Sequence, residues 1–165
     1  MAATLPVPIE FSLPDGWTSA DPDEVNAGEV AFIAFSRAAA GDRFAANITI
    51  NSEVCTEFDG LVSVADGLVE KLGAAAGEIK RGKRDESTTS NGPVLAQVVR
   101  FPLSLPSGER VSVVQYQVLM ALQSSNSDRS SVVLHFTLSA LPDRFVQLLP
   151  DFRAFIETVR FETGR

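Results

Sequence analysis

Three segments in the first third of the chain have the apolar patterns of strands, and two of them alternate between apolar and polar residues. Ile9 to Leu13 and Phe44 to Val54 show the period of two that is typical of a half-buried strand. Val30 to Ser36 is apolar in both phases. A strand of that kind is usually covered on both faces, so we expect it near the centre of a sheet.

Two longer segments repeat apolar residues with the spacing of an amphipathic helix. The first runs from Phe58 to Leu72, and we expect Asp59 to cap its start and Gly73 to end it. The second runs from Pro142 to Phe161 and contains Pro150. Because proline cannot donate a backbone hydrogen bond, either the helix kinks at Pro150 or a new helix begins there.

Four further strand patterns lie between the two helices and are joined by short polar connections. They are Glu78 to Ser87, Val94 to Leu105, Arg110 to Gln123 and Ser131 to Ser139, with turns expected over 88–93, 106–109 and 124–130. Short connections favour an antiparallel meander. We therefore predict one α+β domain over residues 1–165, with an ordered core of about 8–162. Its single antiparallel sheet of about six or seven strands carries one inserted helix and one C-terminal helix.

The order of these elements resembles the PsbP-like fold. Three short motifs support the resemblance: Pro14-Asp15-Gly16-Trp17 after the first strand, Asn47-Ile48 in the third, and Val159-Arg160-Phe161 at the end of a Phe-rich helix. The similarity extends roughly from Pro8 to Glu162 and includes the PsbP, Mog, DcrB-like and actinobacterial LpqN-like families. It implies an α/β/α sandwich.

Members of these families are mostly non-catalytic: they bind other proteins, act as adaptors or chaperones, or have no known role. One DcrB-like branch resembles a clasp that shields hydrophobic helices of secretion effectors. The resemblance thus implies a protein or peptide partner, with a secretion-system client among the candidates. This chain departs from the lipoprotein members, because its single cysteine, Cys55, lies in the middle of the domain.

Composition narrows the function classes. The net charge of −7 and the pI of about 4.7 argue against nucleic acid or an anionic membrane as the main partner. The basic run from Lys80 to Arg84 is better explained as a charged strand that protects a sheet edge. No metal-ligand cluster, phosphate loop or catalytic triad is recognisable, and we expect no cofactor.

The sequence says less about cellular location and oligomeric state than about the fold. Met1 to Pro8 lacks the features of a signal peptide and no apolar stretch reaches membrane-spanning length, so we expect a cytoplasmic protein without membrane insertion. A mature chain whose leader had been removed would look the same. The oligomeric state stays open, a homodimer included. We interpret Cys55 as a small, partly buried hydrophobe.

One sheet face is the candidate binding site. His135 points away from Leu134 and Phe136, so it shares a face with Val133 and Thr137. If the strands are neighbours, this face is polar and almost uncharged, with Val113, Leu119 and Val133 as apolar members. The candidate binding residues are Asn47, Thr49, Asn51, Gln115, Gln117, His135 and Thr137. A face covered by a helix or left to solvent is the alternative.

These observations favour a non-enzymatic module that binds a protein segment through a sheet face. The alternative is a carrier of a small hydrophobic ligand, in which the C-terminal helix closes a Phe-lined cavity of roughly several hundred Å³. An enzyme would have to use carboxylates or His135, and His135 would need an orienting acid or a nucleophile nearby.

Overall fold

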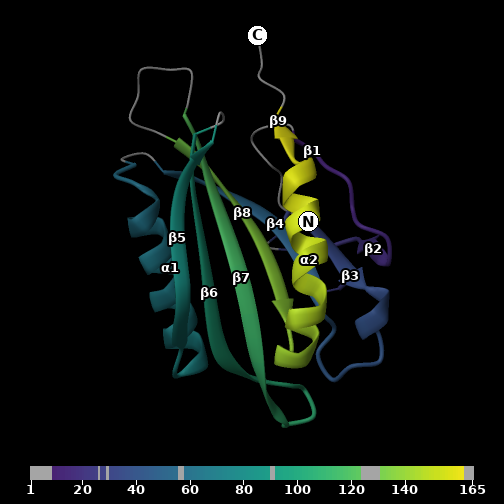
Figure 1. Cartoon of the computed structure of the whole chain (residues 1–165). Helices are drawn as coiled ribbons and strands as arrows, with labels where there is room; N and C mark the ends of the chain where they lie inside the picture. Colours follow the sequence, from purple (N-terminus) through teal and green to yellow (C-terminus); the bar gives the residue numbers. More distant parts are fainter. Residues whose placement is uncertain are drawn as a thin grey trace.

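The computed structural model of the protein describes residues 9–25, 27–28, 30–55, 58–89, 92–123 and 131–161. Its main feature is a seven-stranded antiparallel sheet with the order β2-β3-β4-β8-β7-β6-β5 (Figure 1). The strands are β2 (Trp17–Ala20), β3 (Phe32–Ser36), β4 (Asn47–Cys55), β5 (Lys80–Thr89), β6 (Gly92–Ser104), β7 (Arg110–Gln123) and β8 (Ser131–Ala140). A 3-10 turn, η1 (Arg37–Ala39), follows β3. The predicted α+β class and sheet are confirmed.

The meander predicted after the first helix is also confirmed, since β5, β6, β7 and β8 pair consecutively. The first connection is shorter than predicted: β5 continues to Thr89 and β6 begins at Gly92. The turn expected over 106–109 is present, and Gly108 has a φ of 89° there. The turn expected over 124–130 lies outside the described residues.

Helix α1 (Leu61–Ala76) differs from its prediction at both ends. The N-cap is Gly60 rather than Asp59, whose carboxylate instead accepts a hydrogen bond from the Ser63 hydroxyl at 3.2 Å. The helix passes through Gly73 and ends at Gly77, which adopts the left-handed conformation that favours glycine. Gly73 has a packing role, because a Cβ there would lie 3.1 Å from the Cγ2 of Ile79.

Helix α2 (Pro142–Thr158) contains Pro150 within one assigned helix, so the alternative of a second helix beginning there is wrong. It ends at Thr158, three residues before the predicted Phe161. The chain then forms β9 (Arg160–Phe161), which pairs with β1 (Ile9–Glu10) in a separate two-stranded sheet.

The N-terminal strands correct two predictions. The strand expected over Ile9 to Leu13 shrinks to β1, and β2, which was not predicted, forms the edge of the main sheet. Phe11 follows β1 and packs edge-on against Phe32 and Phe155, so its apolar character reflects core packing rather than pairing. β3 lies second from the edge, not at the centre.

The two helices pack on opposite faces of the sheet, which makes three layers, α1, sheet and α2. On the α2 side, Ile48, Phe136 and Leu138 pack with Phe152 and Phe155. On the α1 side, the apolar residues of β6, β7 and β8 pack under the helix: Leu61, Ala65 and Val69 of α1 face Leu95, Val99, Val113, Leu119 and Val133.

One helix cannot cover a sheet of this width. Strands lie about 4.8 Å apart and a packed helix covers about 10 Å, so seven strands span roughly 29 Å and leave most of each face to other elements. Helix α1 packs on β6 and less on β7, and α2 packs on β8 and β7. In the described part of the chain, no helix is long and apolar enough to span a membrane.

Candidate functional site

Strand register brings the predicted binding residues together on the α1-side face. Thr137 of β8 lies between Thr49 of β4 and Gln117 of β7, and Gln97 of β6 continues the same row. The rows on either side contain Asn47, Ser139 and Gln115, and Asn51, His135 and Leu119. All seven residues predicted from the sequence therefore share one face. Their role in binding stays a prediction.

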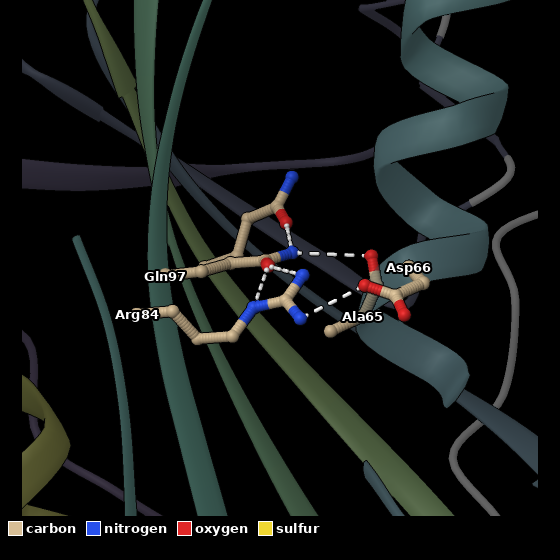
Figure 2. A network of polar contacts seen from close by, with 5 residues as sticks. Ala65, Asp66, Arg84 and Gln97 are labelled. Carbon is tan, nitrogen blue, oxygen red and sulfur yellow. Dashed lines mark hydrogen bonds and ion pairs between the residues drawn. The ribbon is translucent and has the colours of Figure 1, made fainter. Parts of the chain in front are cut away.

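A chain of polar side chains crosses this face beneath α1 (Figure 2). Arg84 of the edge strand β5 donates from Nε and Nη2 to the Oε1 of Gln97, at 3.0 and 2.7 Å, and from Nη1 to the Oδ1 of Asp66 on α1 at 2.8 Å. Gln97 donates in turn to the Oε1 of Gln117 at 2.7 Å and to the carbonyl of Ala65 at 3.4 Å. The network thus ties the edge strand to the helix.

The chain continues from Gln117 to the open part of the face. The Nε2 of Gln117 donates to the Oε1 of Gln115 at 2.9 Å, and the Nε2 of Gln115 donates to the hydroxyl of Ser139 at 3.1 Å. A guanidinium can only donate, so Arg84 orients the Gln97 amide. Each following amide is then oriented by the one before it, and every hydrogen bond runs in the same direction.

Helix α1 divides this face into a covered and an open half. Gln97 and Gln117 lie in the covered half and are only 3% and 4% exposed. The apolar members that were expected to contribute to binding, Val113, Leu119 and Val133, are fully buried there, so that expectation is wrong. The open half lies over β4 and β8, where five predicted residues are half-buried: Asn47, Thr49, Asn51, His135 and Thr137.

Several polar side chains of the open half have no hydrogen-bond partner among the residues that the structure describes. Asn47 donates to the carbonyl of Ala45 at 3.0 Å. The side chains of Thr49, Asn51 and Thr137 make no hydrogen bond to the described part of the chain. Their donors and acceptors are therefore available to water or to a bound segment.

His135 forms the one charged contact of the open half within the described residues. Its Nε2 lies 2.9 Å from the Oε1 of Glu53, and the two side chains are 15% and 47% exposed. Burial lowers the pKa of His135, and the neighbouring Glu53 carboxylate opposes this shift only in part. His135 is therefore mainly neutral at pH 7.

This pair supplies an orienting acid but no activated nucleophile in the described part of the chain. Cys55 is two residues beyond Glu53 and pairs with Ser131, four residues away from His135. Burial, with smaller effects from Glu53 and Asp59, raises the pKa of the Cys55 thiol. A thiol of raised pKa is a poor nucleophile at neutral pH. Cys55 packs against the α1-side core, as the sequence predicted.

Sequence reasoning missed four residues of this site: Glu53, Arg84, Gln97 and Ser139. Gln97 is the one that a pattern could have found, because it occupies the apolar phase of Leu95 and Val99. A lone glutamine in a buried phase indicates a hydrogen-bonded partner. Arg84 was interpreted only as part of a charged edge, and β5 is indeed the last strand of the sheet.

A hollow near the start of α2 is lined mainly by polar residues. It has a volume of about 530 Å³, and Leu141 is its only large apolar residue. Arg144 holds Asp42 there with two hydrogen bonds, at 2.7 and 3.2 Å, which lowers the pKa of Asp42. Such a lining does not suit a lipid. Among the described residues, no group of three His, Cys, Asp or Glu side chains could hold a metal ion.

Comparisons with known proteins establish the fold. No protein-family model matches the sequence. No curated protein matches it either. The solution structure of cyanobacterial PsbP (CyanoP) from Synechocystis matches with a TM-score of 0.61 and 12% identity, over 93% of this chain and 86% of that one.

Two further solved structures are similar. LpqN, involved in cell envelope biogenesis of Mycobacterium tuberculosis, matches with a TM-score of 0.59 and 14% identity, over 96% of this chain and 86% of that one. The Ran-binding protein Mog1p of Saccharomyces cerevisiae matches with a TM-score of 0.55 and 14% identity, over 92% of this chain and 89% of that one. The chain therefore has the PsbP/Mog-like fold, as the element order predicted.

Proposed function

We propose that this protein is a non-enzymatic binding module that holds an extended, polar segment of a partner protein. The segment lies on the open half of the α1-side face, over β4 and β8. The observation that carries the proposal is the set of unpartnered polar side chains there, led by Thr49, Asn51 and Thr137.

The surface has the chemistry to recognise a polypeptide. Uncharged amides and hydroxyls can pair with the donors and acceptors of a peptide backbone without the desolvation cost of burying a charge. Gln115, at the edge of the open half, is held in one orientation by the amide chain behind it. A preorganised surface loses less conformational entropy when it binds.

Two further observations support a binding protein over an enzyme. The His135–Glu53 pair lacks an activated nucleophile among the described residues, and Mog1p, which has the same fold, is a Ran-binding protein. The free thiol of Cys55 is compatible with a reducing compartment, and we propose a cytoplasmic location. A secretion-system client is one partner that would fit.

The test is capture of partners from native lysate with purified protein and identification by mass spectrometry. A double variant, Asn51→Lys with Thr137→Lys, places two charges on the open half. Ser19→Lys is the matched control, because Ser19 is an exposed residue of β2 whose register places it on the other face. We expect a partner that the control retains and the double variant loses. A partner retained by both proteins would remove this surface from consideration.

A further inference from the structure

The α2-side face of the sheet also has a part that its helix does not cover. Helix α2 packs on β8 and β7, and β6 and β5 extend beyond it (Figure 1). The β6 and β7 positions of this part are apolar, whereas β5 contributes the charged Lys83 and Asp85. Ala96 and Val98 of β6 and Tyr116 of β7 are half-buried there.

These side chains line a hollow beside the helix. Ala96, Val98 and Tyr116 form its floor, Phe145 and Leu149 of α2 form one wall, and its volume is about 150 Å³. We call it the α2–β6 groove. Lys83 and Asp85 of β5 complete the lining, and because both are exposed, an apolar side chain can enter from that side.

The helix wall continues with an exposed apolar residue. Val146 is 74% exposed, the most exposed large hydrophobic residue in the described part of the chain. It stands three residues before Leu149 and seven before Arg153, a spacing that puts all three on one side of the helix. Val146 therefore extends the apolar side of the helix that Leu149 contributes to the groove, and its side chain is accessible to a partner.

The rim of the groove is basic although the protein is acidic. Lys83, Arg153 and Asp85 border the hollow, and Asp85 is paired with Lys83 at 3.7 Å. Lys80 and Arg100 face each other on the same side of the sheet. The acidic groups nearby are Asp85, Glu157, which lies one turn beyond Arg153, and Asp143, which lies three residues before Val146. Lys80, Arg100 and Arg153 make no ion pair within the described residues.

This charge pattern selects among occupants. The net charge of −7 repels a second copy of the chain, and it opposes an extended anionic membrane more than a short segment that contacts the rim alone. An acidic segment is repelled by the whole but attracted by this rim. A helix is the shape that fits, because it packs about 10 Å from α2 and about 10 Å above the sheet, which places it over β5 and β6.

We propose that the α2–β6 groove binds an amphipathic helix with acidic flanks from another protein. Its apolar stripe would contact Val146, Leu149 and the floor of the groove, and its carboxylates would pair with Arg153, Lys80 and Arg100. This surface lies on the opposite side of the sheet from the proposed polar segment, and the two proposals stand independently.

The experiment uses a fluorescein-labelled peptide of about 18 residues, long enough for roughly five helical turns. Leu residues occupy positions i, i+3, i+4 and i+7, and Glu residues flank the stripe. A second peptide has Lys in place of every Glu. Anisotropy titrations measure binding to the wild type, to Val146→Glu, to Arg153→Glu and to Val62→Glu. Val62 is an exposed valine of α1 and provides the matched control.

We expect saturable binding of the acidic peptide, weakened about five- to tenfold by Val146→Glu and by Arg153→Glu and unchanged in Val62→Glu. The Lys peptide should bind at least about tenfold more weakly than the Glu peptide. Three results would overturn the proposal: no saturable binding up to about 1 mM, equal loss in Val62→Glu, or equal binding of the two peptides. Binding of anionic vesicles that Val146→Glu abolishes would also overturn it, by assigning the groove to a membrane.

Discussion

Replacement of Gln97 by methionine tests the polar network that ties β5 to α1. Methionine has nearly the shape of glutamine but no hydrogen-bonding amide. The substitution removes the oxygen that accepts two hydrogen bonds from Arg84. It also removes the donor to the Oε1 of Gln117, a residue that is only 4% exposed. Arg84 retains Asp66, so its charge does not become wholly unpaired.

The expected loss follows from these contacts. Hydrogen bonds to a charged group contribute about 1.5–3 kcal/mol, and an unsatisfied buried carbonyl costs about 1–3 kcal/mol. Burial of the methionine side chain offsets roughly 1 kcal/mol. We expect a net loss of about 3 kcal/mol in the free energy of unfolding, which for a domain of this size lowers Tm by about 9 °C.

The loss of unfolding free energy should become smaller along the network, from Gln97 to Gln117 to Gln115. Gln117→Met should cost about 2 kcal/mol, because it breaks two neutral hydrogen bonds in a buried place. Gln115→Met should cost less than about 1 kcal/mol, because Gln115 is half-buried and water can replace it. Urea unfolding, followed by circular dichroism and by the fluorescence of Trp17, measures all three. Equal losses at Gln115 and Gln97, or a loss below about 1 kcal/mol at Gln97, would refute the reasoning.

Three further predictions concern single residues. Because the folded pKa of His135 lies below the ordinary value of about 6.5, its contribution to stability is complete above that pH and is lost as pH falls through the folded pKa. The variant His135→Gln should flatten this part of the plot of unfolding free energy against pH. NMR titration of the single imidazole measures the pKa directly. Gly77→Ala should destabilise by about 1 kcal/mol, since its φ is 86°, whereas Gly67→Ala, in an exposed helix interior with open space, should stabilise by up to about 1 kcal/mol in thermal unfolding. Cys55 should react with iodoacetamide at pH 8 more slowly in the folded protein than in urea, and equal rates would contradict its raised pKa.

The elements could be predicted from the sequence because their periods are local. A two-residue alternation indicates a strand whatever its neighbours are, and it was enough to predict β4 and the four strands β5 to β8. Element ends were less predictable. Gly73 was the predicted stop, but the helix ends at Gly77, which has a φ of 86° and donates its N–H to the carbonyl of Gly73. The first strand was shorter than predicted because it pairs only with the two residues of β9.

Alternation also placed the seven polar residues of the candidate site on one face, because successive side chains of a strand point to opposite sides. Which of them stay accessible was decided by the position of α1, which covers Gln117 and leaves Thr49 and Thr137 open. Nothing local specifies that position. It depends on which strands bury the apolar stripe of the helix.

The polar contacts themselves belong to the tertiary structure. His135 meets Glu53 across 82 residues of chain because β4 pairs with β8. Arg84 meets Asp66 across 18 residues because α1 packs on β6, the neighbour of β5 in the sheet. The sequence by itself determined strands β4 to β8, the two helices and which side chains of a strand share a face. Strand order and helix placement determined the neighbours of every side chain, since contacts between distant residues arise from the burial of the whole core rather than from any local pattern.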